Sequence, residues 1–533
     1  MSFNYYKPSK SEFNDCIAKG VCSVPPTVSA LKEVIVMLLR HLAYYIEKLN
    51  KNGVECDELK KELVSSLAEI FTTADYSDGE VYSSILKNYN NLIQTKEFYI
   101  QLCKDKNIPP QEIRGEVKIS PDMNLARLIS LGEQIFRARG KKLGNNHKQL
   151  FDILLLITRN FASNIITLES AGSIESKYIG KVISSLVILN YPRKSVVKIK
   201  ELISEIVLMN LEVVTKLGSI IYSQFGPVKE ISVNQSSRQG KAILVSGRNL
   251  SDLFNLLTQL ENLDIDVFTH SDLLIAHALD KFSGFKNLYG HYDSGVENFM
   301  LDFATFPGSI LLTHGAVKNL EYLYRGRLFS TDSILPVGVS HIQNNDFTAL
   351  IDSAQNARGF KTGKSKKSIT VGYDADFLYE KLKDAANKFN NKEISKIFVI
   401  GMTSNENRNN DFYNKLLSAA SADTFIITFG GEKKDKNILP INLANNVPLL
   451  FRLMNKFISL LESDYGRISF FISKCDSNSL STMIALKELG FNNIYLSTCP
   501  PNAVNPQTIN ALSRFYGIKT LSNPQEDIKY LVN

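Results

Sequence analysis

The sequence predicts a multidomain protein in which an all-helical N-terminal domain, built from helix bundles, precedes two α/β domains with parallel sheets. Residues 27–220 place apolar side chains at three- and four-residue spacing over long windows, which is typical of amphipathic helices. After residue 233, short β-rich runs alternate with helical segments, which indicates parallel strands joined by crossover helices. At 533 residues the chain is long enough for two to four domains.

The helical domain is predicted from long periodic segments that few turn signals interrupt. The strongest are TVSALKEVIVMLLRHLAYYIEKLN at 27–50, KQLFDILLLITRNFASNII at 148–166 and SVVKIKELISEIVLMNLEVVTKLGSIIY at 195–222. Each repeats its apolar residues with the period of an α-helix, so we expect antiparallel helices that bury these faces against one another. This domain is assigned to residues 1–225.

The two α/β domains are predicted from the alternation that follows. The lysine-rich stretch RGFKTGKSKKS at 358–368 is typical of a boundary, which gives domains at 226–365 and 366–533. The expected strands are 242–247, 264–270, 309–315, 368–373, 394–401, 423–430, 467–473 and 493–498. The expected helices are 250–263, 271–282, 374–389, 411–421, 448–463 and 480–490.

Composition excludes several classes of protein. Hydrophobic residues make up 44% and charged residues 22% of the chain, the balance of a soluble globular protein. The net charge of +7 comes from dispersed lysines, so no nucleic-acid partner is expected. Six scattered cysteines indicate reduced thiols inside a cell, and the apolar runs are too short for a membrane span of about 20 residues. With no signal or transit peptide apparent at the N-terminus, we expect a cytoplasmic protein without a membrane partner.

The loops after the strands contain no familiar catalytic motif. No G-x-G-x-x-G opens a helix, and GFKTGKS at 359–365 has three residues between its glycines where a phosphate loop needs four. His270 and His277 are seven residues apart, unlike the paired metal ligands of H-E-x-x-H, and are interpreted as structural. Acidic residues in strand-to-helix turns, such as Asp272 and Asp476, are usually helix N-caps.

The strand ends taken together resemble those of the hybrid cluster (prismane) proteins, also called hydroxylamine reductases. The resemblance runs along the whole chain, and SGRNL and THSDLL stand where the family has SGHDL and THGEM. It implies a helical domain followed by two Rossmann-like domains, a four-iron cubane cluster and a hybrid iron–sulfur–oxygen cluster. It also implies the reduction of hydroxylamine to ammonia, with a link to nitric oxide reduction. The matching segments are 242–277, 306–317, 368–373, 397–416 and 423–433.

The cubane motif that the resemblance implies is only half present. The family holds this cluster with four cysteines spaced C-x2-C-x8-C-x5-C. Cys16 and Cys22 fall on the third and fourth positions, and Asn4 and Lys7 fall on the first two. An amide is a poor ligand for iron and an ammonium repels it, so two thiolates remain where four are needed.

The hybrid site that the resemblance implies lacks its soft ligands. The family uses one histidine, two glutamates and four cysteines. The histidine falls on Arg248, which cannot ligate, and the glutamates become Asp272 and Asp476. The four cysteine positions fall on Ala316, Thr403, Gly431 and Asn446.

We therefore expect a degenerate homologue that has lost both iron–sulfur centres and carries no cofactor. Such a pseudoenzyme would act by binding or scaffolding, with a protein partner or a second copy of itself. Arg248 is expected to form a salt bridge with Asp272 or Asp476 inside the former cluster cavity, because buried charges need partners.

Three alternatives remain open. Asp272 and Asp476, with His270, His277 or His314, could bind a harder divalent metal or perform acid–base chemistry. The second alternative is that the chain keeps a residual reductase activity toward hydroxylamine or nitric oxide. The third is a partner-binding or nucleic-acid-binding role for the basic segment 358–367.

Overall fold

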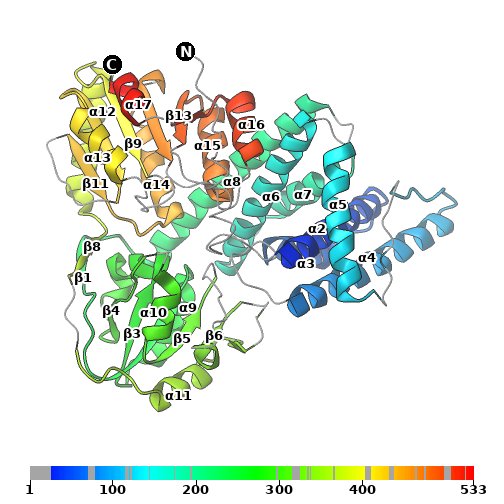
Figure 1. Ribbon diagram of the computed structural model, residues 1–533, viewed down its shortest axis with the longest axis horizontal. Coiled ribbons are helices and arrows are strands. Elements are labelled where there is room, and N and C mark those ends of the chain that lie inside the picture. Colours follow the sequence, from blue (N-terminus) through cyan, green and yellow to red (C-terminus); the bar gives the residue numbers. More distant parts are fainter. Residues whose placement is uncertain are drawn as a thin grey trace.

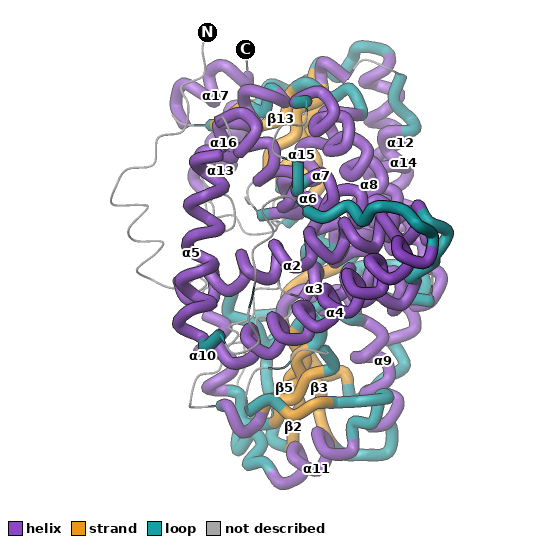
Figure 2. Tube along the Cα trace, turned by 90° about the vertical axis from the view of Figure 1, so that its right-hand side faces the viewer, coloured by secondary structure: helices purple, strands orange, loops and turns teal. Residues whose placement is uncertain are grey.

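A computed structural model shows a helical part and two parallel sheets (Figure 1). The protein is therefore a multidomain α/β protein, as the sequence predicts. The strands of the two sheets lie at opposite ends of the molecule, with helices α2 to α4 at the level between them (Figure 2). The structure describes residues 26–69, 78–113, 119, 123–142, 145–172, 175–191, 195–295, 298–314, 324–332, 335, 338–363, 367–401, 410–430, 437–462, 465–472, 476–496, 506–521 and 524–532.

The helical part is held together by apolar faces of the predicted period. In α2, for example, Leu31, Val34, Leu38 and Leu42 lie on one face and are almost fully buried. At the crossing of α5 over α2, a side chain at Gly132 would lie 1.9 Å from the Ala30 carbonyl oxygen, so only glycine fits. The described helices here are α2 (Pro26–Lys51), α3 (Asp57–Glu69), α4 (Asp78–Asp105), α5 (Leu125–Lys142), α6 (Asn145–Ser170), α7 (Ser176–Ile188) and α8 (Val196–Phe225).

The first sheet is fully parallel, with strand order β4-β3-β2-β5-β6-β7. Alternate residues of each strand enter different cores: Ile243 and Val245 face the main core, and Leu244 faces a second core with Phe268 and Phe306. Its strands are β2 (Lys241–Ser246), β3 (Ile265–His270), β4 (Leu288–His291), β5 (Ser309–Leu312), β6 (Leu328–Ser330) and β7 (Ser340–His341). The accompanying helices are α9 (Leu250–Gln259), η1 (Ser271–Ala278), η2 (Asp280–Phe282), α10 (Phe299–Thr305), η4 (Arg325–Arg327) and α11 (Thr348–Asn356).

The second sheet repeats this arrangement, with parallel strands in the order β11-β10-β9-β12-β13-β14. Its strands are β9 (Lys396–Ile400), β10 (Thr424–Phe429), β11 (Ile438–Ile441), β12 (Ile468–Ile472), β13 (Asn493–Leu496) and β14 (Lys519–Thr520). The helices are α12 (Ala375–Asn390), α13 (Asn410–Ala419), α14 (Val447–Ile458), η5 (Tyr465–Arg467), α15 (Ser477–Glu488), α16 (Pro506–Tyr516) and α17 (Pro524–Val532). In each sheet, numbered from its own first strand, the order is 3-2-1-4-5-6, which is that of a Rossmann sheet.

A two-stranded antiparallel ribbon joins the two α/β parts. It pairs β1 (Ile231–Val233) with β8 (Ile369–Val371). The sequence pattern places 368–373 among the parallel strands, and this is wrong, because β8 pairs only with β1 and lies outside both large sheets. Gly240 and Phe360 also exchange backbone hydrogen bonds, of 3.1 and 2.8 Å, so the chain enters and leaves the first sheet at neighbouring points. The division at 225/226 and 365/366 stays a prediction.

A second expectation also needs correction. The segment 271–282, predicted as one helix after β3, forms the 3-10 turns η1 and η2. Ser271 begins η1 with a φ of +60°, in the left-handed region, so a regular α-helix cannot start directly after His270. His270 is therefore the last residue of β3, and His277 lies in η1.

Within the part of the chain that the structure describes, two helices, α6 and α8, are long and apolar enough by length and composition to cross a membrane. Both pack against other helices, α6 on α7, α8 and α15, and α8 on α6, α14 and α15. Their apolar residues, such as Ile157 and Phe161 of α6 and Ile203 and Ile206 of α8, are buried in these contacts. The core accounts for their apolar character, and the cytoplasmic location stays a prediction.

Candidate functional site

The two switch points of strand order are the places where a doubly wound sheet binds ligands, beyond the carboxyl ends of its strands. In the first sheet this point lies between β2 and β5. Gly247 follows β2 with a φ of +122°, and a Cβ atom there would lie 2.4 Å from Thr313 Oγ1. Glycine is thus required where the chain turns sharply to present Arg248 beyond the sheet.

Arg248 forms the ion pair that the sequence predicts. Its Nε lies 3.7 Å from Asp272 Oδ2, so the two side chains that the resemblance assigns to a histidine and a glutamate position are neighbours. The expectation that this pair is enclosed is wrong, because the Arg248 side chain is 54% exposed. A pair this open contributes about 0–1 kcal/mol to stability.

A second polar group continues along the same edge toward the helical part. His314, which follows β5, lies 3.8 Å from Asp332 and 3.4 Å from the Ser163 hydroxyl of α6. Asp252 of α9 is buried and accepts a 2.6 Å hydrogen bond from Thr331. Burial, with a smaller contribution from the Asp332 charge, raises the pKa of Asp252 to about 6.

Three histidines lie beside this edge; His270 and His291 are buried and His277 is partly buried. The Thr269 hydroxyl is 3.0 Å from His277 Nε2 and 3.0 Å from His291 Nδ1, and so joins the two rings. Burial lowers the pKa of His277 to about 3 and that of His291 to about 4. His277 is therefore a neutral structural histidine, as its spacing in the sequence indicates. The third ring, His270, lies 3.7 Å from Asp302.

Asp293 lies next to these rings and was not anticipated from the sequence. Burial alone would raise its pKa, but the His270 and His291 rings and two backbone N–H groups lower the pKa below its usual value. Its Oδ2 is 3.8 Å from His291 Nε2. The signal available was its place two residues after β4, but LYGH is too short and too rich in polar residues and glycine to be recognised as a strand.

The second sheet uses two of the predicted site residues as helix caps. Asn446 is buried and its side chain accepts a 3.0 Å hydrogen bond from Leu449 N at the start of α14. Asp476 accepts a 2.8 Å bond from Ser479 N and caps α15. Each side chain satisfies a backbone N–H that the helix leaves unpaired. Asp476 thus fits the ordinary N-cap interpretation, whereas Asp272 lies in the first turn of η1, after the N-cap position.

The remaining predicted positions lie outside the described residues. They are the half cubane motif, with Asn4, Lys7, Cys16 and Cys22, and three positions of the hybrid site, Ala316, Thr403 and Gly431.

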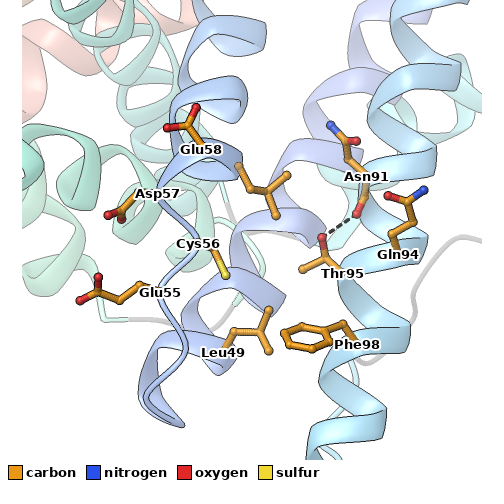
Figure 3. A pocket seen from close by; sticks show the side chains of 10 residues that line it. Leu49, Glu55, Cys56, Asp57, Glu58, Asn91, Gln94, Thr95 and Phe98 are labelled. Atoms are coloured by element: carbon orange, nitrogen blue, oxygen red, sulfur yellow. Dashed lines mark hydrogen bonds between the residues drawn. The ribbon is translucent and has the colours of Figure 1, made fainter.

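The described cysteines are far along the chain from the strand ends. Cys103 of α4 is fully buried in the main apolar core. Cys56 lines a shallow hollow of about 440 Å³ between α2, α3 and α4, together with Leu49, Thr95 and Phe98 (Figure 3). Burial raises the pKa of the Cys56 thiol, which makes it a weaker nucleophile and ligand. The thiol in this hollow is therefore not activated.

Fold and site together define a class: a helical domain joined to two doubly wound sheets, with polar side chains gathered at the carboxyl ends of the first sheet. Comparison with known proteins identifies the family. Residues 12–445 match the Prismane/CO dehydrogenase family, and the chain belongs to this family.

A hydroxylamine reductase from Thermodesulfovibrio yellowstonii is 25% identical over 542 residues, covering 97% of each chain. Solved structures align over most of their length with weaker agreement. Carbon monoxide dehydrogenase IV from Carboxydothermus hydrogenoformans is 11% identical, with a TM-score of 0.45, over 96% of this chain and 88% of that one. A nickel-free carbon monoxide dehydrogenase from Thermococcus sp. AM4 is 11% identical, with a TM-score of 0.47, over 94% of this chain and 84% of that one. No function is inferred from these two.

Proposed function

We propose that this chain is a hybrid-cluster-type homologue that has lost both iron–sulfur centres and functions as a binding or scaffold protein. It would carry no iron cofactor and would not reduce hydroxylamine. Membership of the Prismane/CO dehydrogenase family supports the ancestry. The observation that carries the loss is the ion pair between Arg248 and Asp272.

This ion pair occupies two of the positions at which the family resemblance requires cluster ligands. A guanidinium is a permanent cation with five donors and no lone pair to offer, so it cannot replace a ligating imidazole. It would also repel iron directly. Asp272 lies 3.7 Å from Arg248 and so has a cation of the protein itself beside it. The charges of the pair balance without any cofactor.

Two further positions have other structural roles. The Asn446 side chain is bonded to Leu449 N, and Asp476 is bonded to Ser479 N. An asparagine amide is also a hard, neutral donor that does not match the thiolate preference of iron–sulfur clusters. Together with the residue types at Ala316, Thr403 and Gly431, these positions offer no soft ligand to a hybrid cluster.

The same contacts weaken the alternative that Asp272 and Asp476 perform new metal or acid–base chemistry. Asp272 pairs with a cation and Asp476 caps α15, so neither is poised as a free base. Residual hydroxylamine or nitric oxide reductase activity would require the cluster that the proposal excludes. A protein partner, or a second copy of the chain, is the expected ligand of a protein that keeps the fold without the cofactor.

Iron and acid-labile sulfide, measured on protein purified without oxygen together with its visible absorption spectrum, test the proposal. We expect colourless protein with well under one iron per chain. The hydroxylamine reductase of T. yellowstonii, prepared in the same way, is the matched positive control. Stoichiometric iron and sulfide in this chain would overturn the proposal and make reductase activity the favoured function.

A further inference from the structure

Three side chains converge beside the first sheet, from segments well separated in the sequence. His270 is the last residue of β3, Asp293 follows β4, and Asp302 belongs to α10. One donor atom from each lies within 4.8 Å of the donor atoms of the other two. None of the three coincides with a position to which the family resemblance assigns a cluster ligand.

The His270 ring has an unexplained atom. Its Nε2 is buried and has no hydrogen-bond partner, and the side chain is only 6% exposed. Buried polar atoms are nearly always satisfied, so an orphan of this kind calls for a ligand. The other ring nitrogen, Nδ1, is 2.9 Å from the Ser246 hydroxyl. If Nδ1–H donates to Ser246, the lone pair stands on Nε2, which is the arrangement of a metal-bound histidine.

The two carboxylates are oriented by hydrogen bonds from a short loop and from the strand end. Asp302 accepts bonds from Ser294 N and Ser294 Oγ, at 2.7 and 2.8 Å. Asp293 accepts from Ser271 N at 3.0 Å and Gly295 N at 2.6 Å. These donors hold both groups toward His270 and leave lone pairs for a further ligand.

Charge also calls for a cation at this point. Asp302 is 3% exposed, and among the described residues no lysine or arginine forms an ion pair with Asp293 or Asp302. Two neighbouring carboxylates, Asp302 buried and Asp293 partly buried, bring a negative charge that is costly to keep without a cation beside it. A divalent ion would neutralise it fully.

The spacing fits coordination better than a direct hydrogen bond. His270 Nε2 and Asp302 Oδ2 are 3.7 Å apart, beyond the range of a hydrogen bond. Two ligands at about 2.0–2.2 Å from a tetrahedral ion are separated by about 3.4 Å. One imidazole and two carboxylates suit zinc and similar first-row ions, whereas magnesium and calcium prefer oxygen alone.

We propose that His270, Asp293 and Asp302 bind one divalent transition-metal ion of the zinc type. Three protein ligands leave a fourth position for water or a small ligand, as in open zinc sites. The site does not depend on the fate of the iron–sulfur centres. It gives the first α/β part a metal centre of its own, next to the exposed Arg248–Asp272 pair.

Zinc titration of the full-length, chelator-treated protein by calorimetry tests the proposal. We expect one ion per chain, and a fall to less than about one tenth of an ion at the same concentration in His270→Gln and Asp302→Asn. Ser246→Ala, which removes only the support of the ring, should weaken binding by about 10- to 100-fold. His341→Gln and Asp352→Asn, on the surface of the same part, are matched controls and should bind as the unaltered chain does.

Cobalt(II) substitution of the unaltered chain gives a test that needs no variant. We expect visible bands of nitrogen and oxygen ligation without a thiolate charge-transfer band. A thiolate band would put the ion on cysteines and overturn the proposal, as would absence of binding, or full binding by His270→Gln. Iron and sulfide measured on the same preparation keep this outcome separate from the test of cluster loss.

Discussion

The two sheets share one strand order, and they differ in what stands at their carboxyl ends. In the first sheet this edge carries the Arg248–Asp272 pair, His314 with Asp332, and the group of His270, Asp293 and Asp302, of which the first and last are buried. In the second, the described polar residues Asn446 and Asp476 cap helices. Five of the seven histidines fall within 226–365 and none follows residue 341.

This difference teaches that strand order and edge chemistry vary independently. Aliphatic and aromatic residues on alternating faces build both sheets, and neither core needs the residues beyond the strand ends. One sheet can therefore carry histidines and carboxylates at its edge while the polar residues at the edge of the other cap helices, although the strand order is the same. The following predictions separate what the sheets share from what they do not.

The largest effect is expected from the shared cores. Phe268 of β3 and Phe471 of β12 are fully buried, each within aromatic neighbours, and Phe→Ala at either site should cost about 3–5 kcal/mol of unfolding free energy. Chemical denaturation measures this loss. Phe377→Ala is the control, because that ring is 58% exposed and should change stability by less than about 0.5 kcal/mol. A large loss at one sheet only would break the equivalence of the two cores.

Of the two sheets, the first should be the more sensitive to acid. The pKa of His277 is about 3 in the folded protein, below the usual 6.5, so the unfolded chain binds this proton first as the pH falls. The neutral His277 ring therefore contributes to the free energy of unfolding above pH 6.5. This contribution is lost as the pH falls toward 3, at about 1.4 kcal/mol per pH unit.

His277→Gln should make the free energy of unfolding fall less steeply with decreasing pH. Between pH 6.5 and 4.5 the variant should lose about 3 kcal/mol less than the unaltered chain. Unfolding titrations at several pH values measure it. His341→Gln, at an exposed position, is the control. An unchanged slope in His277→Gln would mean that the ring is protonated in the folded protein.

Asp252 should act with the opposite pH dependence. Its pKa is raised to about 6, so its favourable, protonated state is present below the usual 3.8 and is lost as the pH rises through 6. Asp252→Asn keeps an acceptor for Thr331 and should therefore stabilise the protein by about 2 kcal/mol at pH 7 relative to pH 4. Thermal unfolding at both pH values measures the gain, and Asp352→Asn should show none. A loss of stability at pH 7 would contradict this assignment.

The smallest effect concerns the turn after the second strand of each sheet. Ser271 follows β3 with a φ of +60°, and Gly430 follows β10 with a φ of +94°. A side chain in the left-handed region costs about 1–2 kcal/mol, so Ser271→Gly should stabilise by about 0.5–1 kcal/mol and Gly430→Ser should destabilise by about 1 kcal/mol. Denaturant midpoints of the two variants form the test. Stability changes of the same sign in Ser271→Gly and Gly430→Ser would show that the two turns are not equivalent.

Sequence periodicity predicted the interior of the fold better than its edges. The hydrophobic strands β3, β5, β9, β10, β12 and β13 lie within their predicted ranges and β2 begins one residue before its range, because each of these strands buries three to six consecutive residues. The edge strands β4, β7, β11 and β14, and the short strand β6 beside β7, were not predicted, because two to four residues with polar, glycine or proline positions carry no periodicity. The 3-10 form of 271–278 was hidden for a similar reason, since its apolar residues fit an α-helical window.

The candidate site was predictable where it depends on neighbouring strand ends. The pairing of Arg248 with Asp272 follows from β2 and β3 being adjacent in a parallel sheet. Asp293 and Asp302 come from an unpredicted strand end and a short helix, so their approach to His270 required the three-dimensional fold.

The antiparallel ribbon of β1 and β8 makes the first α/β part an insertion within the chain. Residues 234–368 lie between the two strands, and bringing the ends of an unfolded loop of this length together costs about 4 kcal/mol of chain entropy. Once the first sheet has folded, the exchange of bonds between Gly240 and Phe360 already holds those ends as neighbours. The ribbon can then close at little cost. We therefore expect the inserted sheet to fold first. The ribbon that joins the two α/β parts should form last.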